Sequence, residues 1–121
     1  MISSEDRQSG RTTRMLKRAA AAAIELPSEV WPVCVICASD REVIRCAELA
    51  CDILHAWGIA SARHTRRDRI SIRGGKEIRF YTPHDTRLPG RDFVDVFIDH
   101  YVWDVIDEST GRRIREIPTY R

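Results

Sequence analysis

The chain has 121 residues and a formal net charge of +2. This length predicts a single domain, residues 1–121, that buries one core, and it excludes a chain with a second full catalytic domain. Hydrophobic residues make up 43% of the chain and charged residues 31%, a globular composition that excludes an intrinsically disordered chain.

The charged residues are grouped along the chain, so local fields exceed what the small net charge indicates. The simpler interpretation of both groups is a solvated face, and the alternative for the basic group is a nucleic-acid-binding surface. The basic run comprises Arg63, His64, Arg66, Arg67, Arg69 and Arg73. The acidic stretch comprises Asp92, Asp95, Asp99, Asp104, Asp107 and Glu108.

The sequence shows no recognisable signal peptide, and the apolar stretch AAAAAIEL is too short to span a bilayer. We therefore expect a cytoplasmic protein without a membrane partner, whose four cysteines are reduced thiols. Cys34 and Cys37 have CxxC spacing. Because residues three apart on a strand point to opposite faces, the pair is predicted to be buried core thiols rather than ligands of one metal ion.

The first half of the chain predicts two helices around one strand. Residues 12–24 are rich in alanine, leucine and lysine, which favour a helix, and Pro27 prevents its continuation. From Trp31, WPVCVICAS is a continuous apolar run, typical of a central parallel strand covered on both faces. Ser39 and Asp40 then predict a helix start, residues 41–57 carry apolar side chains three or four apart, and Gly58 ends this second helix.

The second half predicts a series of strands. GIASARH predicts a short strand, and the next two segments, RISIR and KEIRFYT, alternate apolar and polar residues around two glycines. This pattern predicts a hairpin with Ile70, Ile72, Ile78 and Phe80 on one face. The loop PHDTRLPGR leads into another apolar strand, DFVDVFIDHYV. The tail that follows is either a helix and then a strand, or a second hairpin around ESTG.

Helices and strands thus alternate, and no internal repeat is present. This order predicts an α/β fold in which helices flank a mainly parallel sheet that also contains an antiparallel hairpin.

The stretch RQSGRTT, residues 7–13, stands before the first predicted helix and carries groups suited to phosphate. Gly10 allows backbone N–H groups to turn inward, Arg11 supplies a cation, and the Thr12 hydroxyl is a ligand for Mg²⁺. The usual pattern GxxxxGK[ST] has a glycine where this chain has Glu5 and a lysine where it has Arg11. The alternative is that Ser9 or Thr12 caps an ordinary helix.

The run DVFIDH places Asp99 at the end of an apolar strand. Phosphoryl-transfer folds place there the aspartate that holds Mg²⁺. An exposed strand-end aspartate is the alternative. Because Gly10, Thr12 and Asp99 occur in the order that such folds use, we expect them to meet around one crevice at the strand ends.

These two motifs resemble a known family. RQSGRTT resembles the phosphate loop of the large-terminase ATPases of tailed phages, and LPGRDFVDVFIDH resembles the approach to their Asp-Glu strand. The segments between fall where such ATPases have a strand, a helix and a hairpin, so the resemblance spans most of the chain, with only the two short motifs being specific. It implies a shortened P-loop NTPase-like core, phage-encoded, located in the host cytoplasm and associated with DNA.

The resemblance implies a role for each matching residue. Thr12 and Asp99 are the implied Mg²⁺ ligands, and Asp99 and His100 are the implied catalytic residues. His100 stands where the family has a catalytic glutamate, and because a neutral imidazole cannot replace that carboxylate, weak or no hydrolysis is implied. The residues implied in binding ATP are Arg7, Ser9, Gly10, Arg11, Thr12 and Thr13.

The expected function is therefore Mg²⁺-dependent ATP binding by a degenerate P-loop. The alternative is a non-enzymatic interaction module that binds nucleic acid or a host protein through the arginine-rich run. A third arrangement is a homo-oligomer in which Arg87 or Arg91 reaches a neighbour's nucleotide. His84 and Asp85, in a proline-flanked loop, predict a turn rather than a catalytic dyad.

Overall fold

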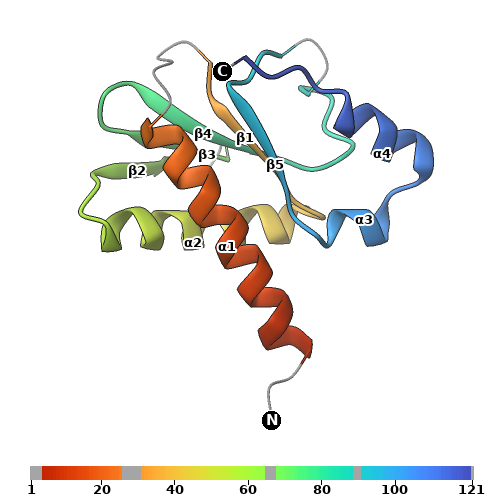
Figure 1. Cartoon of the computed structure of the whole chain (residues 1–121), viewed down its shortest axis with the longest axis horizontal. Coiled ribbons are helices and arrows are strands. Elements are labelled where there is room, and N and C mark those ends of the chain that lie inside the picture. Colours follow the sequence, from red (N-terminus) through yellow and green to blue (C-terminus); the bar gives the residue numbers. More distant parts are fainter. Residues whose placement is uncertain (1–3, 26–30, 65–67, 89–90, 121) are drawn as a thin grey trace.

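The computed structural model describes residues 4–25, 31–64, 68–88 and 91–120. It has an α/β fold built on a five-stranded sheet with the order β2-β3-β4-β1-β5 (Figure 1). The strands are β1 (Val33–Ile36), β2 (Ser61–His64), β3 (Arg69–Ile72), β4 (Lys76–Tyr81) and β5 (Asp95–Ile98). The helices are α1 (Ser4–Glu25), α2 (Asp40–Ala56), α3 (Val102–Val105) and α4 (Glu108–Arg115).

The sheet is mixed, and the prediction of a mainly parallel sheet was wrong. β1 pairs in parallel with β4 and with β5, whereas β3 pairs antiparallel with both β2 and β4. The reason is the length of the connections. The links between β2 and β3 and between β3 and β4 are too short for a crossover, and only antiparallel strands can be joined in this way.

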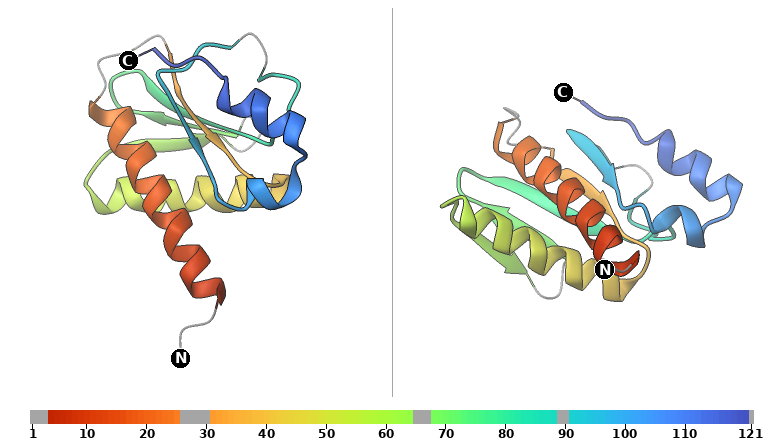
Figure 2. Two further views of the ribbon diagram at one scale, coloured as in Figure 1. Left: turned by 45° about the vertical axis from the view of Figure 1, so that its right-hand side comes forward. Right: turned by 60° about the horizontal axis from the view of Figure 1, so that its bottom comes forward.

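Helices cover both faces of the sheet (Figure 2). Helices α1 and α2 pack on one face, where Leu16 and Leu54 lie with Val35 in the larger apolar cluster. On the other face, Val102 of α3 and Ile114 of α4 pack in a second cluster. Flanking helices were therefore predicted correctly, and the inner strand β1 contributes side chains to both clusters.

Helix α1 begins earlier than predicted. The sequence predicts a start at residue 12, but the helix runs without interruption from Ser4 to Glu25. Gly10 therefore lies inside it, where glycine costs roughly 1 kcal/mol relative to alanine. Burial of Met15 and Leu16 later in the same helix offsets this cost. The alanine-rich half packs closely on the sheet because Ala19, Ala20 and Ala23 are buried.

Helix α2 has the boundaries that its sequence predicts to within one residue. The Ser39 hydroxyl accepts a hydrogen bond from the Glu42 backbone N–H at 3.3 Å, which satisfies one free amide of the first turn. Gly58 has φ of +74°, the left-handed conformation in which glycine ends a helix.

The hairpin and the cysteines also follow the sequence pattern. Ile70, Ile72, Ile78 and Phe80 are all buried, and they lie in the cluster beneath α1 and α2. Cys37 belongs to the same cluster, whereas Cys34 lies in the cluster on the opposite face. The prediction that the CxxC pair points to opposite faces is confirmed.

The C-terminal part contains more helix than either alternative for the tail. ESTG begins helix α4, and the Asp107 carboxylate caps this helix by accepting a hydrogen bond from the Thr110 N–H at 2.7 Å. A single bridge between Phe93 and Thr119 follows, so the helix-then-strand alternative is nearer to the structure. The strand predicted over residues 92–102 is shorter, because β5 ends at Ile98 and α3 begins at Val102.

The helical conformation of Gly10 generates a stability prediction. A methyl group at this position would lie 3.7 Å from Nη1 of Arg14, which is ordinary contact. Gly10→Ala is therefore expected to raise the free energy of unfolding by about 0.5–1 kcal/mol, measured by urea denaturation. Gly111→Ala is the control, because its methyl group would lie 3.4 Å from Ile106 and gain less. A loss of stability in Gly10→Ala would contradict a helix at this position.

Candidate functional site

The candidate site lies at the carboxyl ends of β1 and β5. The chain leaves β1 towards α2 on one face of the sheet and leaves β5 towards α3 on the other. Such a reversal between neighbouring parallel strands is where open α/β sheets form ligand sites. Asp99 follows β5 directly at this place.

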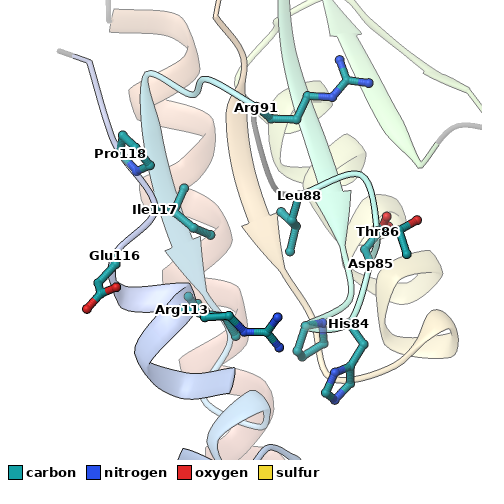
Figure 3. A pocket seen from close by; sticks show the side chains of 11 residues that line it. His84, Asp85, Thr86, Leu88, Arg91, Arg113, Glu116, Ile117 and Pro118 are labelled. Carbon is teal, nitrogen blue, oxygen red and sulfur yellow. The ribbon is translucent and has the colours of Figure 1, made fainter. Parts of the chain in front are cut away.

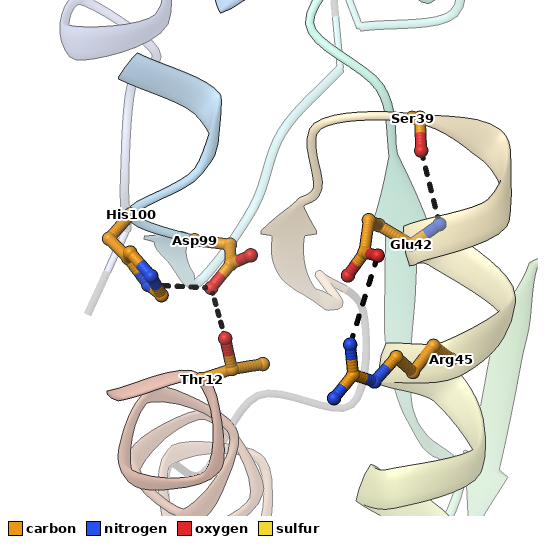
Figure 4. Close-up of polar contacts among 6 residues, drawn as sticks. All are labelled: Thr12, Ser39, Glu42, Arg45, Asp99 and His100. Atoms are coloured by element: carbon orange, nitrogen blue, oxygen red, sulfur yellow. Dashed lines mark hydrogen bonds and ion pairs between the residues drawn. The ribbon is translucent and has the colours of Figure 1, made fainter. Parts of the chain in front are cut away.

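Thr12 and Asp99 are in direct contact (Figure 4). The Thr12 hydroxyl donates a hydrogen bond to Oδ1 of Asp99 at 2.8 Å, across 87 positions of sequence. Thr12 is 4% exposed and Asp99 is fully buried. The structure therefore brings together the two residues predicted as Mg²⁺ ligands, and it excludes the alternative of a solvent-facing Asp99. They meet as a closed contact, not around an open crevice.

The expected phosphate loop is not present at residues 10–13. Gly10, Arg11, Thr12 and Thr13 all lie within helix α1. In a helix each N–H bonds to the carbonyl four residues earlier, so these amides are not free to surround a phosphate. Arg7 and Ser9 belong to the same helix, and their side chains lie outside the described part. The loop prediction was wrong because the helix continues through Gly10, and the buried side chains of Thr12, Met15 and Leu16 hold this part of it in the fold.

His100 contacts the same oxygen of the Asp99 carboxylate as Thr12 does. Its Nδ1 is 3.4 Å from Asp99 Oδ1, and its ring stacks on Tyr101 with ring centroids 4.1 Å apart. Nε2 of His100 is buried and has no hydrogen-bond partner within the described residues. The imidazole is therefore oriented by Asp99 and Tyr101 and retains one unused ring nitrogen.

The second oxygen of Asp99 faces a different group of side chains. Oδ2 has no hydrogen-bond partner among the residues that the structure describes. Donor atoms of Glu42, Cys46 and Asp99 lie within 4.8 Å of one another. Beside them, a hydrogen bond to Cys46, burial, and the negative charges of Asp99 and Glu42 raise the pKa of the Cys37 thiol. This pocket therefore disfavours further negative charge.

A basic depression of about 470 Å³ lies beside the Asp99 contact. Four cations of helix α1 line it, namely Arg11, Arg14, Lys17 and Arg18. Ile98 and His100, at the end of β5, also line it. Among the side chains that the structure describes, which exclude those of residues 4–9, no carboxylate forms an ion pair with these four cations. The depression is therefore suited to an anion.

Sequence reasoning named Arg11 but missed Arg14, Lys17 and Arg18. Their spacing of three and four residues places them on one side of a helix, which is the signal that identifies them. Glu42 and Cys46 were also missed. They are four apart in α2, but their relation to Asp99 depends on how the helix packs on the sheet.

The arginine-rich run is largely paired with acidic residues where it is described. Nη1 of Arg63 forms an ion pair with Oε1 of Glu48 at 3.0 Å, and Nη1 of Arg69 lies 3.6 Å from Oε1 of Glu77. Arg66 and Arg67 lie outside the described residues. Arg63 and Arg69 are therefore engaged with carboxylates, and Arg73 is exposed, as the predicted solvated face requires.

A larger depression, of about 660 Å³, lies on the opposite face between residues 83–88, Arg91 and α4 (Figure 3). Leu88, Ile114 and Ile117 give it an apolar floor, and His84 and Arg113 lie close together at one end. His84 does not form a dyad with Asp85. The Asp85 carboxylate accepts hydrogen bonds from the Arg87 backbone and side chain, which lower its pKa. The predicted turn is confirmed, and Asp85 holds Arg87 in its own protomer.

Known proteins give no further assignment, since no protein-family model, curated protein or solved structure matches this chain. In the described part of the chain, no helix is long and apolar enough to cross a membrane.

The Thr12–Asp99 contact predicts a specific loss of stability. Thr12→Val keeps the shape but removes the donor, so a buried carboxylate oxygen loses its hydrogen bond. We expect the free energy of unfolding to fall by about 1.5–3 kcal/mol, measured in urea. Thr12→Ser keeps the hydroxyl and is expected to lose only about 1 kcal/mol for the missing methyl group. An equal or larger loss in Thr12→Ser would show that the hydroxyl does not hold Asp99.

Proposed function

We propose that this chain binds ATP with Mg²⁺ at the end of β5, with the phosphates in the basic depression and the ion at Asp99 and Thr12. The observation that supports this most is the 2.8 Å contact between Thr12 and the buried Asp99 beside four helix cations. The resemblance to the phage terminase ATPases, including a DNA-associated role, remains part of the proposal.

The phosphate part of the proposal depends on charge. Arg11, Arg14 and Arg18 lie on one side of α1, and each guanidinium can donate two parallel hydrogen bonds to phosphate oxygens. In a P-loop the backbone amides do much of this work, but here they are used within the helix. Side-chain cations would therefore hold the phosphates, which makes binding strongly dependent on salt.

The magnesium part depends on oxygen ligands. Mg²⁺ prefers hard oxygen donors and retains several waters, so the Thr12 hydroxyl and the Asp99 carboxylate suit it chemically. His100 lies between the depression and Asp99, so entry of the ion requires the imidazole to turn aside.

His100 determines what chemistry can follow binding. The His100 imidazole next to Asp99 does not add the second carboxylate that orients water in efficient ATPases. The proposed activity is therefore nucleotide binding with weak or no hydrolysis.

Nucleic-acid binding is a second candidate because the same cations of α1 would contact a phosphate backbone equally well. The arginine-rich hairpin adds Arg73, which is exposed. Retention on DNA that falls steeply with salt, together with no effect of ATP, would favour this candidate over the first.

The nucleotide proposal predicts a charge-dependent affinity. Calorimetry with ATP and Mg²⁺ is expected to show binding by the natural chain. The double variant Arg11→Glu with Arg14→Glu is expected to bind at least about tenfold more weakly, or 1.4 kcal/mol, because repulsion replaces two attractive contacts. Arg112→Glu, an exposed substitution in α4, is the matched control and leaves the affinity unchanged.

Asp99→Asn tests the ion separately from the phosphates. It is expected to remove the Mg²⁺ dependence of binding while retaining weak affinity for inorganic tripolyphosphate. Absence of binding by the natural chain at millimolar ATP would eliminate the proposal, and equal loss in Arg112→Glu would reduce it to non-specific charge attraction.

A further inference from the structure

One buried oxygen of the Asp99 carboxylate has no partner among the described residues. Asp99 is fully buried, and Thr12 and His100 both contact Oδ1, so Oδ2 is the unpartnered atom. An unpaired buried carboxylate oxygen is costly, and a cation at this point would compensate it. Figure 4 shows this oxygen on the side of Asp99 that faces Glu42.

The atoms around this oxygen form a set of metal donors. A carboxylate oxygen of Glu42, the Cys46 thiol and a carboxylate oxygen of Asp99 all lie within 4.8 Å of one another. Glu42 and Cys46 are four apart in α2, so they project from the same side of the helix. Nη1 of Arg45, an exposed side chain, lies 4.0 Å from Oε1 of Glu42.

A fourth donor lies next to this set. Cys37 directly follows β1, is buried, and shares a hydrogen bond with Cys46. Glu42, Cys46 and Asp99 already lie together, and the adjacent Cys37 would supply the fourth ligand of a four-coordinate Zn²⁺ site. Thiolates are poor ligands for Mg²⁺, which prefers oxygen.

We propose that Cys37, Glu42, Cys46 and Asp99 form a binding site for a thiophilic divalent cation of the Zn²⁺ class. The ion would link the first turns of α2 to the ends of β1 and β5. The site uses Oδ2 of Asp99, whereas the proposed Mg²⁺ contact uses Oδ1 and Thr12, so this inference does not rest on nucleotide binding.

Titration with Co²⁺ tests the site directly. The metal-free, reduced chain is titrated without nucleotide and with Mg²⁺ in excess. We expect one equivalent of Co²⁺ to give sulfur-to-cobalt charge-transfer absorption and the visible bands of tetrahedral Co²⁺. Zn²⁺ should abolish both sets of bands by displacement and should raise the thermal unfolding midpoint.

Two buried cysteines on opposite faces of the sheet provide a matched pair of variants. Cys46→Ala is expected to weaken Co²⁺ binding at least about tenfold and to lose charge-transfer intensity. Cys34→Ala, in the opposite cluster, is expected to change neither. Glu42→Gln, at a partly exposed position, gives a second test of affinity if Cys46→Ala does not fold.

Absence of charge-transfer absorption in the natural chain would overturn the proposal, as would displacement of Co²⁺ by Mg²⁺ or equal losses in Cys34→Ala and Cys46→Ala. The double variant Arg11→Glu with Arg14→Glu separates the two proposals. It should keep the cobalt spectrum whether or not the natural chain binds ATP.

Discussion

Burial of the Asp99 carboxylate is the constraint on which the arrangement at the strand ends depends. A charged oxygen removed from water must be compensated, and Thr12 compensates Oδ1 from a helix 87 positions earlier in the chain. The contact therefore ties the N-terminal helix to the last strand of the sheet. It also places the cations of α1 next to that strand end, because Thr12 and Arg11 are neighbours on the same helix.

Two proposals share this one carboxylate, and its two oxygens face different surroundings. Oδ1 lies with a hydroxyl, an imidazole and the basic depression. Oδ2 lies towards a carboxylate and two thiols. Hard cations suit the first environment and thiophilic cations suit the second. The different chemistry of the two sides is what allows separate experiments to address each.

Much of the fold could be predicted from side-chain periodicity. The apolar spacing of α2, the alternation in the hairpin and the opposite faces of Cys34 and Cys37 all follow from local geometry. Strand direction could not be predicted in the same way, because it depends on which strands become neighbours. The start of α1 was missed because Ser9, Gly10 and Thr12 are weak helix formers, and tertiary packing overrides their local preference.

The candidate site was only partly predictable because part of it depends on which elements pack against one another. Thr12 and Asp99 were paired by motif order, and the structure brings them into contact, although in a helix rather than a loop. Glu42 and Cys46 carry no motif that connects them to Asp99. Their proximity arises from the packing of α2 against the ends of β1 and β5, which no local pattern encodes.

Lys76, at the start of β4, donates a hydrogen bond to the Ile24 carbonyl in the last turn of α1. Helix α1 is thus attached at Thr12 and again twelve residues later, about 18 Å along its axis. The buried alanine side chains of α1 are small and interlock little with the sheet, so they do little to prevent the helix from sliding or rotating. The hydrogen bonds at Thr12 and at the Ile24 carbonyl restrain the rotation of α1 about its axis. They thereby keep the arginines of α1 next to the end of β5.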